Sequence, residues 1–509
     1  MPSATTVLIG LHLAAAMVLA SYGLHRLLLA VRYVRRVRGR QTVPAREPDF
    51  LPSVTVQIPL YNERYVAERA ILASGKLDYP KDLLEVQVLD DSTDDTSQAV
   101  ARAVSQLRAK GVQAVHLRRT SRVGYKAGAL AAGTEQARGE FLAIFDADFV
   151  PTPDFLRRVV GEFRDPTVGM VQARWGHLNA ESSLLTRAQA LQLDAHFTVE
   201  HGVRAAAGWF FNFNGTAGVW RRQAIESAGG WHTDTLTEDL DLSYRAQLAG
   251  WRFVYRDDLE VPAELPVEVA AYRTQQQRWA QGGIQTACKI LPTLARAQIP
   301  TSIRREAFWH LTAHFTYPAM VLLAMVGLAA GWVLGPLHRS WLLAADGALL
   351  TFALAALTVF YGVAAWVRGG PRWWRRLATV PVILVLGVGI ALGQAAAVYR
   401  GLTRKSTPFL RTPKYRLGQE GDGSWRLTPY RLAASKKALA ECTVGLTVLA
   451  VAAHVLLSYG TSPTGSALVF GLGFTAVGVA ALVQRRPGAR TTAPRSGRRS
   501  RLALTHSRE

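Results

Sequence analysis

Six long apolar runs constrain more than any other feature how this 509-residue chain can fold. The first covers residues 6–31, and the others cover residues 308–335, 341–366, 378–399, 438–458 and 465–483. A helix needs about 20 apolar residues to cross the hydrocarbon core of a bilayer, and all six runs are close to this length or longer. We therefore expect an integral membrane protein that crosses the cell membrane several times.

Basic residues lie beside these apolar runs. The formal net charge is +22, and arginines follow the first run (Arg32, Arg35 and Arg36) and the last (Arg485 and Arg486). Such an excess of Lys and Arg is typical of the cytoplasmic flanks of membrane proteins. Nucleic-acid-binding proteins instead gather basic residues on one face or along one helix. The charge pattern favours membrane lipids as partners and argues against nucleic acid.

The first apolar run differs from a secretory signal peptide in its charge order. No Lys or Arg precedes residue 6, whereas several arginines follow residue 31. A signal peptide carries its positive charge before the apolar region and a small-residue cleavage site after it. We expect residues 1–45 to form a retained transmembrane anchor with a basic flank, so that the chain is cytoplasmic from residue 32 onward.

Counting all six runs as crossings conflicts with the positive-inside rule. The basic loop 400–437 and the Arg-rich tail would then lie outside the cell. Both become cytoplasmic if the run 378–399 lies along the interface or re-enters. We therefore expect five crossings in total and a membrane domain over residues 301–486, in which 378–399 is an interfacial helix. The tail 487–509 is predicted to be disordered.

Residues 46–300 predict a cytoplasmic α/β domain. Short apolar runs at 53–60, 85–92, 112–118 and 141–148 each precede a helical stretch, which predicts a largely parallel, doubly wound sheet. Ligands of such sheets bind beyond the carboxyl ends of the strands. Polar or charged groups follow all four runs: Tyr61-Asn62-Glu63, Asp90-Asp91-Ser92, Arg122 to Lys126, and Asp146-Ala147-Asp148. This convergence predicts an active site at that edge.

Asp146 and Asp148 are candidate metal ligands. Two carboxylates one residue apart can ligate one divalent cation, and Mg²⁺ is typically held by one or two carboxylates together with substrate phosphates. A lone Asp-x-Asp would more often be a solvated turn, but this pair directly follows an apolar strand. The position favours a site for Mg²⁺ or Mn²⁺.

Two other strand ends predict nucleotide contacts. Asp90 and Asp91 are suited to a nucleobase or ribose, while Ser92 or Thr93 is expected to cap the next helix. The turn around Lys126 combines glycines, a cation and a helix start, which suits a diphosphate.

Two segments later in the domain add candidate catalytic groups. Thr237-Glu238-Asp239 precedes a helical stretch, and helix capping with acids in the first turn would explain all three residues. In the functional interpretation, one carboxylate is a general base that takes a proton from a sugar hydroxyl. Gln275, Arg278 and Trp279 fall on one helix face. They are suited to bind hydroxyls, a phosphate and a sugar ring.

Together these segments resemble glycosyltransferase family 2, and specifically its membrane-embedded, cellulose-synthase-like branch. The resemblance is dense over about residues 50–300 and looser in the membrane part. It rests on VQIPLYNE, QVLDDSTDDT, GYKAGAL, AIFDADFVP, FNFNGTAGVWR, TEDLDLSYRAQLAGW and QQQRW, in the family's order. It is strongest toward mannan, glucomannan and glucan backbone synthases. It implies a GT-A, Rossmann-like nucleotide-sugar domain inserted between transmembrane helices, and an inverting, metal-dependent transfer.

The resemblance also implies roles for individual residues. The nucleotide-sugar side would comprise Asp90, Asp91, Lys126, Asp146, Arg278, Thr412 and Lys414. The acceptor side would comprise Gln275, Trp279, Asn214 and Gly215. Catalysis would use Asp239, Glu238 and Asp148, and the metal would bind Asp146 and Asp148. Thr412 and Lys414 belong to Phe409–Lys414, which looks like the family's F-x-V-T-x-K gating segment, with Arg411 where the family has valine.

The sequence therefore predicts a processive hexosyltransferase. It would transfer mannose or glucose, from GDP-mannose or UDP-glucose, to a growing β-linked polysaccharide that is translocated across the membrane. One alternative is a transferase that adds a single sugar to a lipid acceptor, but Gln-x-x-Arg-Trp and the gating-like segment argue against it. Another is a binding protein or transporter with an inactive sugar domain, which the set of metal, base and leaving-group residues disfavours.

Overall fold

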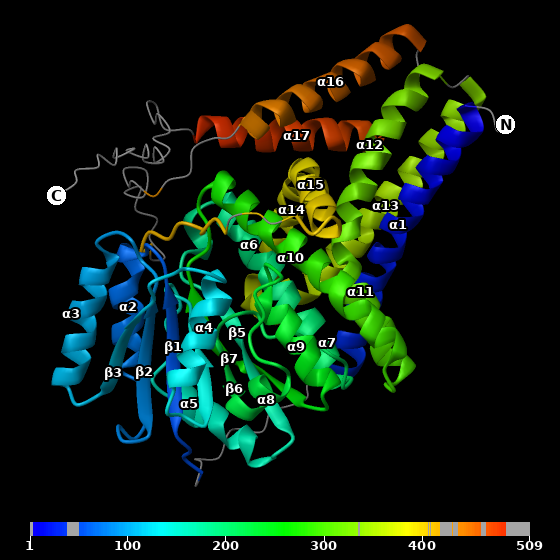
Figure 1. Ribbon diagram of the computed structural model, residues 1–509. Coiled ribbons are helices and arrows are strands. Elements are labelled where there is room, and N and C mark those ends of the chain that lie inside the picture. Colours follow the sequence, from blue (N-terminus) through cyan, green and yellow to red (C-terminus); the bar gives the residue numbers. More distant parts are fainter. Residues whose placement is uncertain are drawn as a thin grey trace, which may run out of the picture.

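The computed structural model describes residues 4–37, 50–333, 336–405, 407, 409–417, 430, 436–459 and 465–484. An α/β domain lies at one end, and a set of long helices extends from one side of it (Figure 1). Of the predicted segments, the residues around the boundary at 46, most of the loop 400–437 and the whole tail 487–509 lie outside the described residues.

A seven-stranded mixed sheet forms the centre of the α/β domain, in the order β3-β2-β1-β4-β6-β5-β7. Its strands are β1 (Val54–Leu60), β2 (Leu84–Asp90), β3 (Gln113–Arg118), β4 (Phe141–Ile144), β5 (Val168–His177), β6 (Gly218–Arg221) and β7 (Arg252–Ala263). All neighbours pair in parallel except β6, which is antiparallel to β4 and β5. The predicted largely parallel sheet is confirmed. Strands β5, β6 and β7 were not among the predicted strands, which all lie before residue 150.

Helices cover both faces of this sheet. One face carries α2 (Arg64–Ser74), α3 (Thr96–Ala109) and α5 (Phe155–Val160), and the other carries α4 (Tyr125–Gln136), α8 (Arg222–Ser227) and α9 (Glu238–Leu248). Strand β4 supplies Phe141 and Ala143 to the first core and Leu142 and Ile144 to the second. Burial on both faces explains why this strand is apolar throughout.

The loops after β1 and β2 are tied together through Asn62. Its backbone is left-handed (φ 55°), a conformation that Asn adopts more readily than most residues. Its side-chain oxygen accepts the Thr93 N–H (2.8 Å), and its own N–H donates to the Ser92 hydroxyl (2.9 Å). The prediction that Ser92 or Thr93 caps the next helix is therefore wrong. Helix α3 begins at Thr96, whose N–H donates to the Asp94 carboxylate (3.0 Å).

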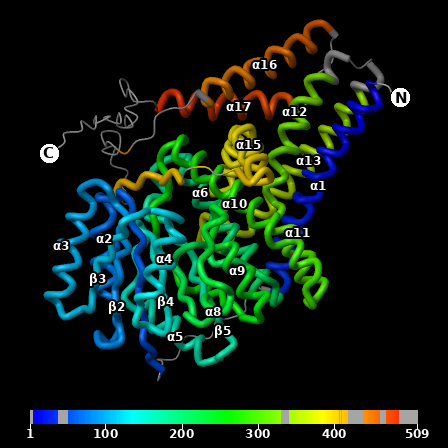
Figure 2. Tube along the Cα trace, viewed as in Figure 1, coloured from blue at the N-terminus to red at the C-terminus, as the bar shows by residue number. Residues whose placement is uncertain are grey.

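The chain between β5 and β6 forms α6 (Leu184–Ala195), a π-helical turn η4 (His196–His201) and α7 (Gly202–Ala206). After β7, the long helix α10 (Val269–Arg296) leads toward the apolar helices. These are α1 (Ala4–Arg32), α11 (Thr301–Thr312), α12 (Thr316–Val333), α13 (Pro336–Arg368), α14 (Val380–Gly389), α15 (Ala391–Leu402), α16 (Lys436–Tyr459) and α17 (Gly465–Val483). Helices α1, α12 and α13 run side by side, and α16 and α17 form a separate pair (Figures 1 and 2).

Within the described residues, four helical segments are long and apolar enough to cross a membrane: Ala4–Arg36, Thr301–Ala329, Ser340–Arg368 and Lys437–Ser458. A fifth would be Gly370–Gly389 with Ala391–Leu402, if this pair, bent by 52°, is one broken span. Within the run 378–399 the helix breaks between α14 and α15, and the expected position of this run at the interface stays a prediction. The break follows Gly389, where α14 packs closely against α17.

The contact at Gly389 generates a stability prediction. A Cβ on Gly389 would lie 2.2 Å from the Val477 side chain and 2.5 Å from the Gly473 carbonyl oxygen. We expect Gly389→Ala to force α14 and α17 apart and to lower the free energy of unfolding by about 1–3 kcal/mol. Thermal unfolding of the purified protein in detergent measures this. Gly387→Ala is the matched control, since a Cβ there meets no described atom within 4 Å. Equal melting temperatures for the two variants would contradict the prediction.

Candidate active site

A cleft opens beyond the carboxyl ends of β1, β2 and β4. Its empty volume is about 1310 Å³ when the space open to solvent is included. The strand ends, the first turn of α9, helix α10 and the segment 409–414 line it. The predicted site residues that line the cleft are Asp91, Lys126, Asp146, Asp148, Asn214, Gly215, Glu238, Asp239, Gln275, Arg278, Trp279, Thr412 and Lys414.

Asp90 is the one predicted site residue that does not line the cleft. It is 1% exposed, and its carboxylate accepts hydrogen bonds from the Ser92 N–H (2.8 Å), the Ser97 hydroxyl (2.6 Å) and His116 Nε2 (2.9 Å). Burial alone would raise the pKa of Asp90, but these hydrogen bonds outweigh it and hold the pKa at about 2. Asp90 therefore fixes the loop that carries Asp91, and this geometry leaves it no ligand contact.

Asp91 is held by an arginine that the sequence patterns did not single out. Arg119 Nε donates to one Asp91 oxygen (2.9 Å), and Arg119 Nη2 donates to the other. Beside them, the Arg122 guanidinium lies 3.3 Å from the centroid of the Tyr61 ring, and both residues line the cleft. This end of the cleft combines a fixed carboxylate with a stacked cation and aromatic ring. Arg119 lies in the basic run 118–122, which was its only sequence signal, whereas Arg122 was among the polar groups expected after the third strand.

The two aspartates after β4 each bind a lysine ammonium. Lys126 Nζ donates to Asp146 Oδ1 (2.5 Å) and to the Gly215 carbonyl (2.8 Å), and Lys414 Nζ donates to Asp148 Oδ2 (2.6 Å). Both carboxylates thus already attract a positive charge, one from the start of α4 and the other from the segment 409–417. Carboxylate oxygens are the ligands that Mg²⁺ and Mn²⁺ prefer. The residues present fit a divalent cation that would replace these ammonium groups.

Gly215 brings the loop before β6 against the first turn of α9. Its backbone is left-handed (φ 80°), and a Cβ there would lie 3.0 Å from Asp239 Oδ2 and 3.4 Å from Lys126 Nζ. The next residue, Thr216, accepts the Asp146 N–H through its hydroxyl (2.9 Å). A side chain at position 215 would therefore crowd both Asp239 and Lys126.

Glu238 and Asp239 form an acidic pair in the first turn of α9. Burial, and then repulsion from the Glu238 carboxylate, raise the pKa of Asp239 to about 7, and burial also raises the pKa of Glu238. A carboxyl group whose pKa lies near neutrality is suited to accept a proton during a reaction. The capping explanation does not hold for Thr237: its hydroxyl lies 3.1 Å from the Thr286 hydroxyl of α10, and its side chain caps no described residue.

Gln275, Arg278 and Trp279 project from α10 into the cleft, as their spacing predicted. Arg278 Nη1 donates to the Leu410 carbonyl (3.1 Å), and its guanidinium lies 4.5 Å from the centroid of the Phe409 ring. The helix and the segment 409–417 are therefore joined at Arg278.

The segment 409–417 closes one side of the cleft. Phe409 stacks on Tyr125 (5.6 Å between ring centroids), and Arg411 pairs with Glu63 (3.4 Å). The Thr412 side chain is buried and lines the cleft, and its hydroxyl has no hydrogen-bond partner among the described residues. Arg411, which stands where the family has valine, therefore forms an ion pair with Glu63.

Glu264 anchors this segment, and the sequence patterns missed it. Its two carboxylate oxygens accept the backbone N–H groups of Tyr415 (2.7 Å) and Leu417 (3.1 Å), and its carbonyl accepts Lys414 Nζ (2.5 Å). Its position one residue after β7 was the only local signal. The pairing joins residues about 150 positions apart, so no periodicity could indicate it.

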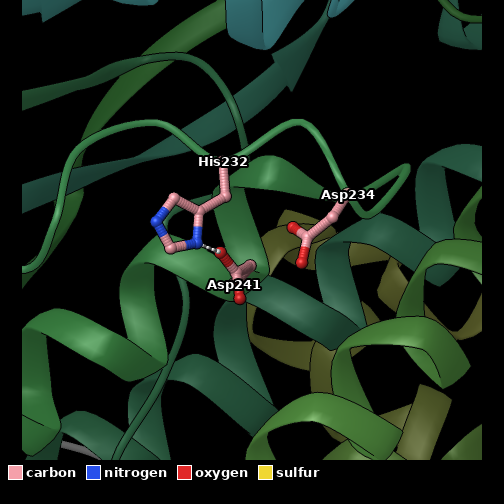
Figure 3. A group of neighbouring side chains, drawn as sticks. All are labelled: His232, Asp234 and Asp241. Atoms are coloured by element: carbon pink, nitrogen blue, oxygen red, sulfur yellow. Dashed lines mark ion pairs between the residues drawn. The ribbon is translucent and has the colours of Figure 1, made fainter.

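A second cluster of ionisable residues lies where the loop 231–237 meets α9. His232, Asp234 and Asp241 converge there, with potential ligand atoms within 4.8 Å of one another (Figure 3). However, Lys289 Nζ lies 2.8 Å from His232 Nδ1, 2.9 Å from the Asp234 carboxylate and 3.0 Å from the Asp241 carboxylate. An ammonium group already provides the positive charge, so we interpret the cluster as an ion-pair network that fixes the start of α9.

Known proteins are similar to this chain over its α/β domain. Residues 52–282 match the model of glycosyltransferase like family 2. Glucomannan 4-beta-mannosyltransferase 2 of Arabidopsis thaliana is 47% identical over 250 residues, which is 48% of this chain and 47% of that protein. Glucomannan 4-beta-mannosyltransferase 1 of Oryza sativa subsp. japonica is 44% identical over 279 residues, which is 52% of this chain and 54% of that protein. The matches thus cover about half the length of these relatives.

A solved structure shares the fold. A mannosyltransferase from Pyrobaculum calidifontis, in complex with GDP-Man and Mn²⁺, is 23% identical, with a TM-score of 0.53 over 72% of this chain and 99% of that one. The expected GT-A class is confirmed, with apolar helices on both sides of the domain in sequence. The family match and the relatives together show that residues 52–282 are a family 2 glycosyltransferase domain.

Proposed function

We propose that this protein is a membrane-bound, inverting glycosyltransferase that adds hexose units processively to a growing β-linked polysaccharide. The observation that supports this best is the convergence in one cleft of a carboxyl group with a raised pKa, an aspartate pair and the Gln-x-x-Arg-Trp face of α10. The similarity to glucomannan mannosyltransferases favours mannose as the sugar and GDP-mannose, rather than UDP-glucose, as the donor.

The donor half of the cleft would bind the nucleoside diphosphate. Asp91, fixed by Arg119, would face the nucleoside, and Arg278 would bind the diphosphate through its planar fork of donors. Asp146 and Asp148 would hold Mg²⁺ or Mn²⁺, which when bound supplies positive charge to stabilise the leaving group. Once released from these aspartates, Lys126 and Lys414 would be free to bind phosphate oxygens.

The acceptor half would supply the nucleophile. Asp239 would take the proton of an acceptor hydroxyl as that oxygen forms a bond to the anomeric carbon of the donor sugar. The bond from that carbon to the diphosphate breaks on the opposite face, so the configuration inverts and the nucleoside diphosphate leaves. Trp279 would stack on an acceptor ring, and Gln275, Asn214 and Gly215 would contact its hydroxyls.

The position of the cleft supports a polymeric product. Helix α10 lines the cleft with Gln275, Arg278 and Trp279 and packs along α15 of the bent helix pair. A chain bound to these residues would therefore lie next to the apolar helices. In the proposed organisation, residues 1–45 anchor the protein, 46–300 form the cytoplasmic transferase domain, and 301–486 form the membrane domain through which the polymer is translocated. The segment 409–414 would close over the donor.

The function is tested with the full-length protein in liposomes, supplied with Mg²⁺ or Mn²⁺ and with labelled GDP-mannose or UDP-glucose in separate reactions. We expect nucleotide release and labelled product of high molecular weight from GDP-mannose. A small, lipid-soluble product would overturn the polymerase in favour of transfer to a lipid acceptor. No transfer from either donor would indicate a binding protein.

The same assay tests the role of Asp239. Asp239→Asn should reduce product formation by about 10²–10⁴-fold, the range for a lost general base, and leave the Kd for GDP within about twofold. Asp154→Asn is the matched control, because the Asp154 side chain is largely exposed on the surface of the same domain. Full activity of Asp239→Asn would exclude Asp239 as the base.

The raised pKa of Asp239 predicts the pH dependence. A base acts only when deprotonated, so kcat should rise with pH through a midpoint near 7 and level off at higher pH. Glu238→Gln removes the repulsion that raises the pKa of Asp239, and the midpoint should move to lower pH. Both are read from pH–rate profiles at saturating donor. A midpoint that is the same in the variant and the wild type would contradict this assignment.

A further inference from the structure

A partly buried series of polar side chains connects the loop that carries Asn214 with the π-helical turn η4. Asn214 Nδ2 donates to His196 Nε2 (3.0 Å), and His196 Nδ1 lies 2.8 Å from Glu200 Oε2. Asn214 lines the cleft, whereas neither His196 nor Glu200 does. Of these three side chains, only Asn214 therefore reaches the cleft. Turns of this helical type often lie at functional sites.

Glu200 is held in its charged form. Burial acts to raise its pKa, but the hydrogen bond from His196 and the charge of Arg204 outweigh burial and keep the pKa well below the usual range. Arg204 Nη1 lies 3.7 Å from Glu200, and Arg204 Nε donates to Glu306 (3.0 Å). A charged carboxylate can only accept hydrogen bonds.

The negative charge of Glu200 determines which ring nitrogen of His196 carries a hydrogen, and this in turn orients the Asn214 amide. Because Glu200 accepts, Nδ1 of the His196 ring carries the hydrogen. In the tautomer with that hydrogen, the lone pair of Nε2 accepts from the Asn214 amide nitrogen. The Asn214 backbone N–H donates to Gln172 Oε1 (2.9 Å), which fixes the loop as well. The Asn214 amide oxygen is therefore directed away from His196, and it is a buried acceptor without a hydrogen-bond partner in the described part of the chain.

We propose that His196 and Glu200 are positioning residues, which orient the Asn214 amide so that its oxygen accepts a hydrogen bond from a hydroxyl of the acceptor sugar. The inference rests on the proposed function. Asn214 directly precedes Gly215, where an added Cβ would lie 3.0 Å from Asp239 Oδ2. The hydroxyl would therefore belong to the sugar unit that lies beside the proposed base Asp239. A site with a preset acceptor discriminates against analogues that lack the matching hydroxyl, because its own polar group is then left unpaired.

Substitutions at His196 test this with a soluble β-linked manno-oligosaccharide as acceptor. His196→Ala should raise the KM for the acceptor about tenfold, the effect of one lost hydrogen bond. The KM for the donor should stay within about twofold. His196→Gln should restore the wild-type value, since its amide oxygen reaches the position of Nε2. His196→Asn should not, since its shorter side chain reaches only the position of Nδ1.

Thr198→Ala is the matched control, because it tests whether a general disturbance of the turn η4 is enough to change the KM. Thr198 lies in the same turn, and its hydroxyl accepts Arg368 Nε (2.9 Å). The KM of the Thr198→Ala variant for the acceptor should equal that of the wild type. The inference is overturned if His196→Ala leaves that KM unchanged, or if Thr198→Ala and His196→Ala raise the KM values for donor and acceptor alike. A wild-type protein that elongates no acceptor would instead refute the proposed function itself.

Discussion

The arrangement of the cleft depends on the neutralisation of its carboxylates by cations that come from other parts of the chain. Lys126 binds Asp146 from the start of α4, and Lys414 binds Asp148 from the segment 409–417. Charges of opposite sign at such short distances attract strongly where water is partly excluded. The segment 409–417 lies over the cleft because its cations find carboxylates there, and because Glu264 binds its backbone. A cation and a diphosphate that enter the cleft must redistribute these pairs, which couples ligand binding to the position of the segment.

The acidic pair of α9 depends on a different kind of support. Gly215 lets the loop before β6 approach Asp239 closely, and Lys289 neutralises the cluster around Asp241 on the same helix. Both contacts hold the first turn of α9 in place while Glu238 and Asp239 stay near each other. The resulting repulsion, together with burial, produces the raised pKa that a general base requires.

Local patterns were sufficient to predict the four strands before residue 150 and the polar groups at their ends, because apolar runs and strand–helix alternation depend on neighbouring residues. Similar reasoning placed Gln275 and Arg278 on one face of α10. It could not separate Asp90 from Asp91, because the contacts of Asp90 with Ser97 and His116 form only in the folded domain. Arg119 and Glu264 were missed for the same reason, since their partners are 28 and about 150 residues away. His196 was missed although Glu200 is only four residues away, because its contact with Asn214 forms only in the folded domain. The close contact of Gly389 with α17 likewise joins residues far apart in sequence, so no pattern within 378–399 could indicate it.

The most direct test of the central claim is a cryo-EM structure of Asp239→Asn in lipid nanodiscs with GDP-mannose and Mn²⁺. Our account predicts the diphosphate between Arg278 and the Asp146–Asp148 pair, with Lys126 and Lys414 released from both aspartates. The mannose should lie beside residue 239. Nucleotide bound elsewhere on the domain, or lysines still paired with both aspartates in the liganded protein, would contradict the account.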